Sequence, residues 1–273
     1  MQKYAFTGQG HVVIVIPAYK EQLNTEEQYS VRALQKHLAK YDVAIVTPET
    51  LRSLPIPCHQ EKYRDSYFEN TATYSKLLLS REFYERFAQY EYMLVYQLDA
   101  LVFSDQLSYW CSQKYDYIGA PVNLRKNNSA SPAFVGNGGF SLRNIASCLT
   151  VLTQGNLSRT QAQTFRSLLT NTPVDVASFG GLSRVRKALS IARQMRTGVD
   201  GYIQQYTMNE DLFWSLRATA FAPNFALPSL EVAARFAVET NPRMWLALSG
   251  NELPFGCHAW AKWDRSVWEA YLP

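Results

Sequence analysis

The sequence lacks the cysteine pairs and the long apolar runs that mark several common protein classes. It contains no C-x-x-C pair, so the sequence indicates neither a zinc site nor a disulfide framework; its cysteines are Cys58, Cys111, Cys148 and Cys257. No run reaches the roughly 20 apolar residues that a membrane-spanning helix needs. The first residues show no basic region followed by a long apolar core, so we expect no signal peptide. These absences predict a cytoplasmic protein with reduced thiols.

Two phosphate-binding signatures are also missing. No G-x-G-x-x-G turn follows the first apolar run and no P-loop is present, which disfavours dehydrogenases and nucleotidyltransferases. The net charge of +4 is mild, so it suits small anionic ligands and does not indicate nucleic-acid binding. Apolar residues, in contrast, make up 47% of the 273 residues and aromatic residues 14%, which indicates a well-filled globular core.

The stretch from Tyr92 to Phe103 is an apolar run interrupted by one amide, Gln97, and one acid, Asp99. Its first part has the composition of a strand that is covered on both faces. Because a carboxylate is costly to bury unpaired, we expect Asp99 at the end of that strand, where another group satisfies it. Ligands of open α/β sheets bind at the carboxyl ends of strands, although an Asp that caps the next turn is the plainer alternative.

The beginning of the chain has the pattern strand, helix, strand. Residues 11–17 form a β-branched run that ends in proline, apolar residues then recur at helical spacing from Thr25 to Lys40, and residues 42–47 form a second apolar run. This order predicts a parallel pair joined by a right-handed crossover. We expect an irregular connection over residues 48–69 and one helix from Thr71 to Phe87.

The second half of the chain has fewer strand signals. Residues 123–132 are polar and form a candidate active-site loop, and residues 155–208 predict helices and loops. Five basic residues and no acid lie between Arg184 and Arg196, which favours a solvated face of a packed helix; a docking surface for an anionic acceptor or membrane lipid is the alternative. With no repeat or linker, the predicted fold is a single α/β domain whose mostly parallel, Rossmann-like sheet is flanked by helices.

Several stretches together resemble the GT-A family of nucleotide-sugar glycosyltransferases. Residues 13–21 are similar to the first strand and loop of that fold, where base and ribose bind. Residues 74–77, followed by residues 96–103, resemble the Thr-Lys-Leu helix start and the Leu-Asp-Ala-Asp-x-Leu-Val strand of the glycogenin-like branch. The overall order is most similar to an uncharacterised family described only as glycosyltransferases.

Three later motifs add to the resemblance. Gly138-Gly139 is similar to the glycine pair under sugar and acceptor, and Glu210-Asp211 resembles the acid pair of inverting members. His258, in a Gly-x-His-x-Trp setting, resembles a late histidine that binds metal in some branches. Read without the family, the glycine pair is a tight strand entry, the acids cap a helix, and the histidine belongs to the core or surface.

The resemblance implies a hexosyltransferase of polysaccharide biosynthesis with a GT-A-like domain over residues 1–273. Its donor-binding part would cover about residues 1–122 and its acceptor and catalytic part about residues 123–273. It would move a sugar from a nucleotide-sugar donor to a hydroxyl of a glycan or lipid-linked acceptor, with inversion, in contact with no nucleic acid and at most with the membrane periphery. The implied donor residues are Pro17, Ala18, Tyr19, Glu21, Lys76, Gln97 and Asp99. The implied sugar and acceptor residues are Asn137, Gly138, Gly139 and Trp214, with Asp211 or Glu210 as the base and Asp99 and His258 as metal ligands.

The sequence departs from the family at the Asp-x-Asp motif, which here is Gln97-Leu98-Asp99. In the family this motif holds Mn²⁺ or Mg²⁺ against the donor diphosphate. An amide is a weaker ligand than a carboxylate for these hard cations, so we expect weaker metal binding, with Lys76 supplying part of the lost charge. The substitution also leaves open a non-catalytic relative that binds nucleotide sugars or carbohydrate without turnover.

Overall fold

The computed structural model describes residues 6–8, 10–53, 56–123, 133–155, 161–170, 174–177 and 179–273. The candidate active-site loop expected over residues 123–132 lies outside these residues except for Asn123.

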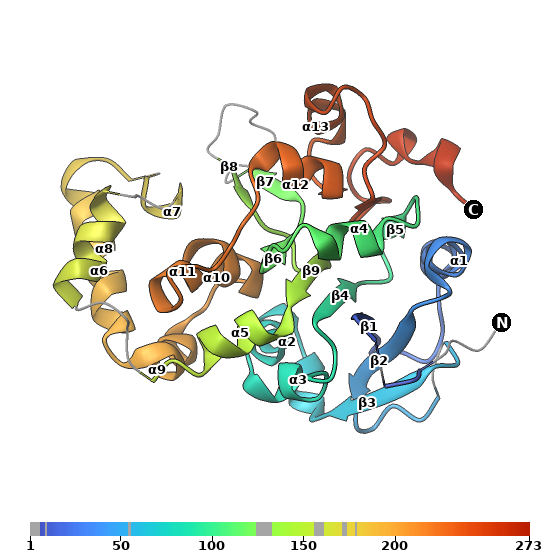
Figure 1. Ribbon diagram of the computed structural model, residues 1–273, viewed down its shortest axis with the longest axis horizontal. Helices are drawn as coiled ribbons and strands as arrows, with labels where there is room; N and C mark the ends of the chain where they lie inside the picture. The colour runs from blue at the N-terminus through green and yellow to red at the C-terminus, as the bar shows by residue number, and fades with distance from the viewer. Residues whose placement is uncertain are drawn as a thin grey trace.

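A six-stranded sheet with the strand order β3-β2-β1-β4-β9-β6 runs through the centre of the molecule (Figure 1). Its strands are β1 (Val12–Pro17), β2 (Asp42–Pro48), β3 (His59–Tyr63), β4 (Tyr92–Tyr96), β6 (Tyr117–Ile118) and β9 (Phe140–Asn144). Strands β3, β2, β1 and β4 pair in parallel, whereas β9 is antiparallel to its neighbours β4 and β6. The prediction of an α/β fold with a mostly parallel sheet flanked by helices is therefore confirmed.

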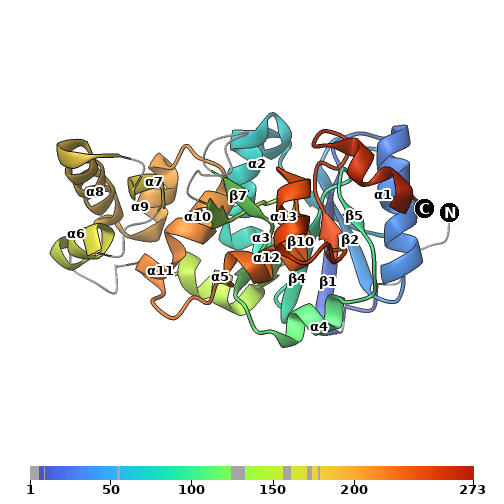
Figure 2. The ribbon, with the colours of Figure 1, turned by 90° about the horizontal axis from the view of Figure 1, so that it is seen from above.

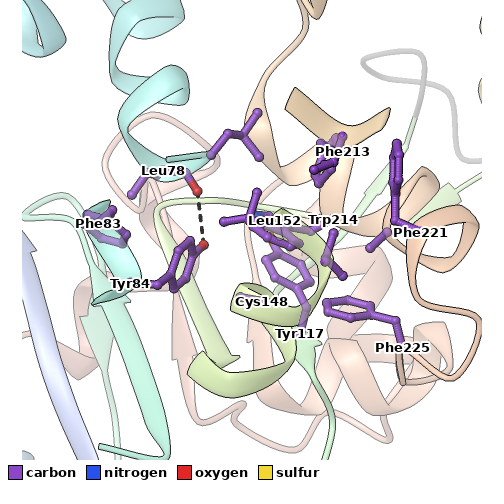
Figure 3. Close-up of a cluster of buried hydrophobic side chains, with 14 of the residues drawn as sticks. Leu78, Phe83, Tyr84, Tyr117, Cys148, Leu152, Phe213, Trp214, Phe221 and Phe225 are labelled. Carbon is purple, nitrogen blue, oxygen red and sulfur yellow. Dashed lines mark hydrogen bonds between the residues drawn. The ribbon is translucent and has the colours of Figure 1, made fainter. Parts of the chain in front are cut away.

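Two hydrophobic clusters cover the two faces of this sheet. In β1, Ile14 and Ile16 belong to one cluster and Val13 and Val15 to the other, so the strand is apolar throughout because both faces are buried. Helices α1 (Thr25–Leu38), α4 (Leu107–Ser112), α12 (Leu230–Phe236) and α13 (Pro242–Leu248) contribute to the first cluster. The second cluster, partly drawn in Figure 3, receives side chains from α2 (Thr71–Leu78), α3 (Arg81–Glu85), α5 (Ile145–Leu152), α10 (Glu210–Leu216) and α11 (Ala218–Phe221).

Four helices, α6 to α9, extend the molecule along its long axis, and the other remaining elements are short. Helices α6 (Gln161–Thr170), α7 (Val174–Ala177), α8 (Gly181–Met195) and α9 (Gly198–Gln205) lie toward one end and α1 lies at the other (Figures 1 and 2). Two small sheets contain β7 (Pro121–Asn123) with β8 (Ala133–Val135), and β5 (Leu101–Val102) with β10 (Ala237–Val238) and β11 (Gly256–Cys257). Three short 3₁₀ turns are Asp65–Phe68, Arg265–Val267 and Glu269–Tyr271. Within the described ranges, no helix has both the length and the apolar character needed to cross a membrane.

Two local predictions need correction. The helix expected from Thr71 to Phe87 is divided into α2 and α3, because Ser80 lies between them and its hydroxyl accepts a hydrogen bond from the Phe83 N–H (3.2 Å). The connection expected over residues 48–69 contains the strand β3, which the hydrophobic pattern misses because this polar segment forms one edge of the sheet. Residues 155–208 are helical wherever the structure assigns them a regular element, as expected.

Candidate functional site

The carboxyl ends of β1 and β4 meet the start of β9 at one edge of the sheet. Because β9 is antiparallel to β4, its first residue, Phe140, pairs with Tyr96 at the end of β4. The Gln97 N–H consequently donates to the Gly139 carbonyl oxygen at 2.7 Å. The topology thus places the predicted glycine pair beside Gln97-Leu98-Asp99, although the two segments are far apart in the sequence.

The small β10-β11-β5 sheet brings two more ionisable residues to the same edge. Cys257 of β11 pairs with Leu101 of β5 on one side and with Val238 of β10 on the other. His258 follows β11 and Glu239 follows β10, and His258 lies beside both Asp99 and Glu239. His258 was among the predicted site residues and Glu239 was not. The sign of Glu239 in the sequence is its position directly after a short apolar run.

His258 lies between three oxygen-bearing side chains. Its Nε2 is 3.1 Å from Asp99 Oδ1 and 3.1 Å from Gln97 Oε1, and its Nδ1 is 3.4 Å from Glu239 Oε1. Burial by itself lowers the pKa of His258, but the carboxylates of Asp99 and Glu239 outweigh burial and raise it to about 10. Burial likewise favours a raised pKa for Asp99, but the hydrogen bond and charge of His258 outweigh it and hold that pKa below its usual value. In the absence of other ligands the pair is therefore imidazolium and carboxylate at neutral pH.

The spacing of these side chains can be compared with that of a divalent-cation site, although the described residues contain no group of three His, Cys, Asp or Glu side chains arranged to hold a metal ion. Neighbouring ligands of an octahedral Mg²⁺ lie about 3 Å apart, because each metal–oxygen distance is about 2.1 Å. The separations of His258 Nε2 from Asp99 Oδ1 and Gln97 Oε1, 3.1 Å each, match such an edge. One carboxylate, one amide oxygen and one imidazole suit Mn²⁺ or Mg²⁺, although this set has fewer anionic oxygens than an Asp-x-Asp site.

Asn137 connects the glycine pair to two acids. Its φ of 72° lies in the left-handed region, which Asn tolerates better than most residues. Its backbone N–H donates to Asp211 Oδ2 (2.9 Å), and its side-chain amide nitrogen donates to Glu239 Oε2 (3.2 Å). Its side-chain oxygen accepts from the Gly139 N–H at 2.9 Å. One residue thereby fixes the positions of Asp211, Glu239 and Gly139.

Asp211 is a carboxyl group poised to titrate near neutral pH. Burial, followed by the charge of Glu210, raises the pKa of Asp211 to about 7. Backbone N–H groups of Asn137 and Leu212 each donate to it at 2.9 Å, which limits the rise. A buried carboxyl group with this pKa can accept a proton from a substrate hydroxyl under physiological conditions.

Glu210, the other predicted acid, is held by a buried cation instead. The fully buried guanidinium of Arg143 donates from Nη2 to Glu210 Oε1 (2.8 Å) and from Nη1 to the Tyr84 hydroxyl (3.0 Å). A side chain at position 138 would begin only 1.9 Å from Glu210 Oε1, so glycine is needed there for the acid to fit. Arg143 was not among the predicted site residues. The sequence feature that could have indicated it is a single charge in the segment Phe140 to Leu152.

Two adjoining cavities flank the acid and histidine cluster. The larger, of about 540 Å³, is lined by residues of the first 99 positions, including Pro17, Ala18, Tyr19, Asn24, Glu27 and Asp99. The smaller, of about 350 Å³, is lined among others by Asn137, Gly138, Gly139, Asp211, Glu239 and His258. Thr71, Tyr74 and Gln97 line both. The smaller cavity also includes Lys262, an exposed cation four residues after His258 that sequence analysis did not single out.

Three predicted residues lie elsewhere. The Lys76 ammonium donates to the backbone carbonyls of Ile203 and, at 2.6 Å, Tyr206, so it satisfies the end of α9 and lines neither cavity. Trp214 is fully buried against the aromatic rings of the second cluster (Figure 3). Glu21 is exposed and does not line the larger cavity. The structure therefore does not place these three side chains where the resemblance implied.

A family model describes most of the chain. The model of a protein family of unknown function, DUF5672, matches residues 58–258. The chain belongs to the DUF5672 family. The matched segment of this DUF5672 protein includes Gln97, Asp99, Asn137, Asp211 and His258. A search of curated proteins finds no significant match to the chain.

Solved structures of glycosyltransferases overlap with the DUF5672 chain at low identity. The glycosyltransferase GlyE of Streptococcus pneumoniae TIGR4 is 12% identical with a TM-score of 0.44, covering 96% of this chain and 60% of GlyE. The galactosyltransferase LgtC, solved in complex with donor and acceptor sugar analogs, is 12% identical with a TM-score of 0.47, covering 94% of this chain and 92% of LgtC. The chain thus spans about 60% of the GlyE structure, and neither overlap fixes its activity.

Gly139→Ala should disrupt the histidine cluster. A Cβ at this position would lie 2.1 Å from His258 Nε2, so the imidazole or the strand must move. We expect a loss of about 1–3 kcal/mol in the free energy of unfolding, measured with urea. Gly155→Ala is the matched control, because nothing lies within 4 Å of its added Cβ, and it should change stability by less than about 0.5 kcal/mol. Equal effects of the two substitutions would contradict this packing of the imidazole against the glycine.

Asp211→Asn should stabilise the protein in a pH-dependent way. The pKa of Asp211 is about 7 in the folded chain and 3.8 is the ordinary value, so the folded state binds its proton more tightly. Wild-type protein therefore loses stability as pH rises from about 4 to 7, and the uncharged variant does not. We expect the variant to exceed wild type in unfolding free energy at pH 8, on the order of a few kcal/mol, and this gap to narrow at pH 5. A gap that is the same at both pH values would refute the raised pKa.

Proposed function

We propose that this protein is an inverting glycosyltransferase that moves a sugar from a nucleotide-sugar donor to an acceptor hydroxyl. The observation that carries the proposal is the position of the Asp99 and His258 cluster between two adjoining cavities, with the Asp211 carboxyl, of pKa about 7, in the smaller one. Transfer from such a donor needs a held diphosphate, stabilised leaving-group charge and a base, and each has a candidate in this arrangement.

The larger cavity is the proposed donor site. It opens at the carboxyl ends of β1 and β4, where ligands of open α/β sheets bind. Tyr19, a lining residue that is 66% exposed, offers a flat face to a nucleobase. The side-chain oxygens of Asn24 and Asn70 cap α1 and α2, so their amide nitrogens are the groups that would donate to a ligand. Asp99, which lines this cavity, would face the diphosphate together with a bound cation.

The smaller cavity is the proposed site of the transferred sugar and the acceptor. Among its lining residues, Ser75 Oγ, Asn123 Nδ2 and Thr240 Oγ1 are buried without a hydrogen-bond partner within the part of the chain that the structure describes. An unsatisfied buried polar atom is costly, so such atoms call for a ligand or water. Rotation of these side chains toward the cavity would let the hydroxyl groups of a sugar satisfy them, which supports a polyhydroxylated ligand.

In the proposed reaction Asp211 accepts the proton of the acceptor hydroxyl while that oxygen attacks the anomeric carbon. The bond between the anomeric carbon and the diphosphate oxygen breaks, and the nucleoside diphosphate leaves with the bonding electrons. The Lys262 ammonium, which lines the smaller cavity, would balance part of the charge that develops on the leaving group. A single base and direct displacement would invert the anomeric centre.

A divalent cation, Mn²⁺ or Mg²⁺, is the proposed cofactor. Asp99, Gln97 and His258 would hold it, and when bound it would neutralise charge on the donor diphosphate. With Lys76 directed at the end of α9, that lysine does not supply the charge lost with the first acid of the motif. This placement is also the observation that favours the second candidate, a relative that binds nucleotide sugars without transferring the sugar.

Activity is tested by nucleoside diphosphate release from a panel of nucleotide sugars, with and without sugar acceptors. Asp211→Asn should lower the rate by about 10²–10⁴-fold while donor affinity persists, since it removes the base. The wild-type rate should fall as pH drops below about 7, where Asp211 becomes protonated. Asp99→Ala should weaken donor binding, whereas Lys76→Met should not. Donor binding without release under any condition would favour the non-catalytic alternative, and absence of donor binding would reject both.

Metal binding is tested by calorimetric titration of the chelator-treated protein with Mn²⁺. Gln97→Asp should bind more tightly than wild type because it adds an anionic oxygen, and His258→Ala should bind more weakly because it removes a ligand. Asp211→Asn, changed outside the three proposed ligands, should bind like wild type. If all four proteins bound Mn²⁺ with the same affinity, the assignment of the ligands would be wrong.

A further inference from the structure

One side of α8, at the end of the molecule remote from α1 (Figures 1 and 2), combines exposed apolar and basic side chains. We define the α8 outer face as the residues that share this side at helical spacing, namely Leu182, Val185, Arg186, Leu189, Arg193 and Arg196. The opposite side of the helix, which includes Ala188, Ile191 and Met195, is buried in the second cluster. The outer face is therefore not needed for packing of the helix.

Two of the three apolar members of this face are well exposed, and the third, Leu189, is half-buried. Leu182 is 76% exposed and Val185 is 41% exposed, and Phe179, just before the helix, is 44% exposed. Single exposed apolar residues are common, but three within seven positions at one tip of the molecule form a patch. Such a patch indicates contact with an apolar partner.

The charged residues of α8 itself have one sign. No acidic residue lies in α8, whereas Arg186, Arg193 and Arg196 are exposed on its outer face. Asp200, the next acid along the chain, is paired with Arg81 at 2.8 Å. The surface therefore presents cations without neutralising acids of its own helix.

We propose that the α8 outer face binds a lipid bilayer that contains anionic lipids. Leu182, Val185 and Phe179 would enter the boundary between headgroups and acyl chains, while the arginines pair with lipid phosphates. The apolar residues favour a bilayer over a nucleic acid, because a phosphodiester backbone offers no apolar partner to Leu182 and Val185. The proposal does not depend on glycosyl transfer, because a bound bilayer is measured without substrate.

The test is sedimentation of the 273-residue chain with vesicles. Wild-type protein should sediment with vesicles of equal parts phosphatidylcholine and phosphatidylglycerol, and not with phosphatidylcholine alone. The double variant Arg186→Gln/Arg193→Gln should lower the partition coefficient by tenfold or more, at about fivefold for each charge. Arg32→Gln/Lys36→Gln, which removes two exposed charges from α1 at the other end, is the matched control and should bind like wild type.

A second double variant, Leu182→Ser/Val185→Ser, tests the apolar contribution. It should also bind weakly, although every charge is retained, and its unfolding midpoint should match that of wild type because both side chains are exposed. The proposal is overturned by lack of wild-type binding to the anionic vesicles, or by equal losses in the α1 control. It is also overturned if the Leu182 and Val185 variant binds vesicles as tightly as wild type, or if single-stranded RNA binds this face and the vesicles do not.

Discussion

The buried cation of Arg143 joins three elements at the centre of this structure. The Arg143 guanidinium has no exposed surface, and its hydrogen bonds join β9 to Tyr84 of α3 and to Glu210 of α10. Removing one partner of such a pair leaves an uncompensated buried charge and typically costs about 3–5 kcal/mol. Since Asp211 follows Glu210, the ion pair that fixes Glu210 also sets where the Asp211 carboxyl enters the smaller cavity. The ion pair therefore fixes Glu210, and Asp211 is the acid that remains available as the proposed base.

Much of the site was predictable because it is built from strand ends. A buried strand ends where its run of apolar residues ends. The apolar pattern alone is therefore enough to place Pro17, Gln97 and Asp99 at one edge of the sheet. The glycine pair and His258 were suggested by the family resemblance, and the antiparallel course of β9 with the pairing of β11 explains why they reach the same edge. Pairing of that kind joins segments that are distant in the sequence, and the sequence carries no local sign of it.

The predictions that failed concern side-chain direction and polar burial. Lys76 follows Tyr74 by two positions on α2, and residues so spaced point to different sides of a helix, so one lines the cavities and the other faces α9. Trp214 follows Asp211 by three positions, but its large apolar surface is stabilised by burial among Phe213 and Phe225. Polar β3 was missed because an edge strand does not need an apolar pattern, and buried charges such as Arg143 break the pattern by which a core is recognised.

The charges of the two cavities constrain what can bind there. Acids outnumber bases among the lining residues, and most bases are already engaged: Lys20 pairs with Glu27 at 2.8 Å and His258 lies between Asp99 and Glu239. A diphosphate that entered alone would meet these carboxylates. Among the lining residues of the described chain, Lys262 is the cation that lies outside an ion pair. The elevated pKa of Asp211 removes one negative charge at and below neutral pH, which reduces this repulsion but also withholds the base. The proposed divalent cation would offset these acids and so favour binding of the donor diphosphate.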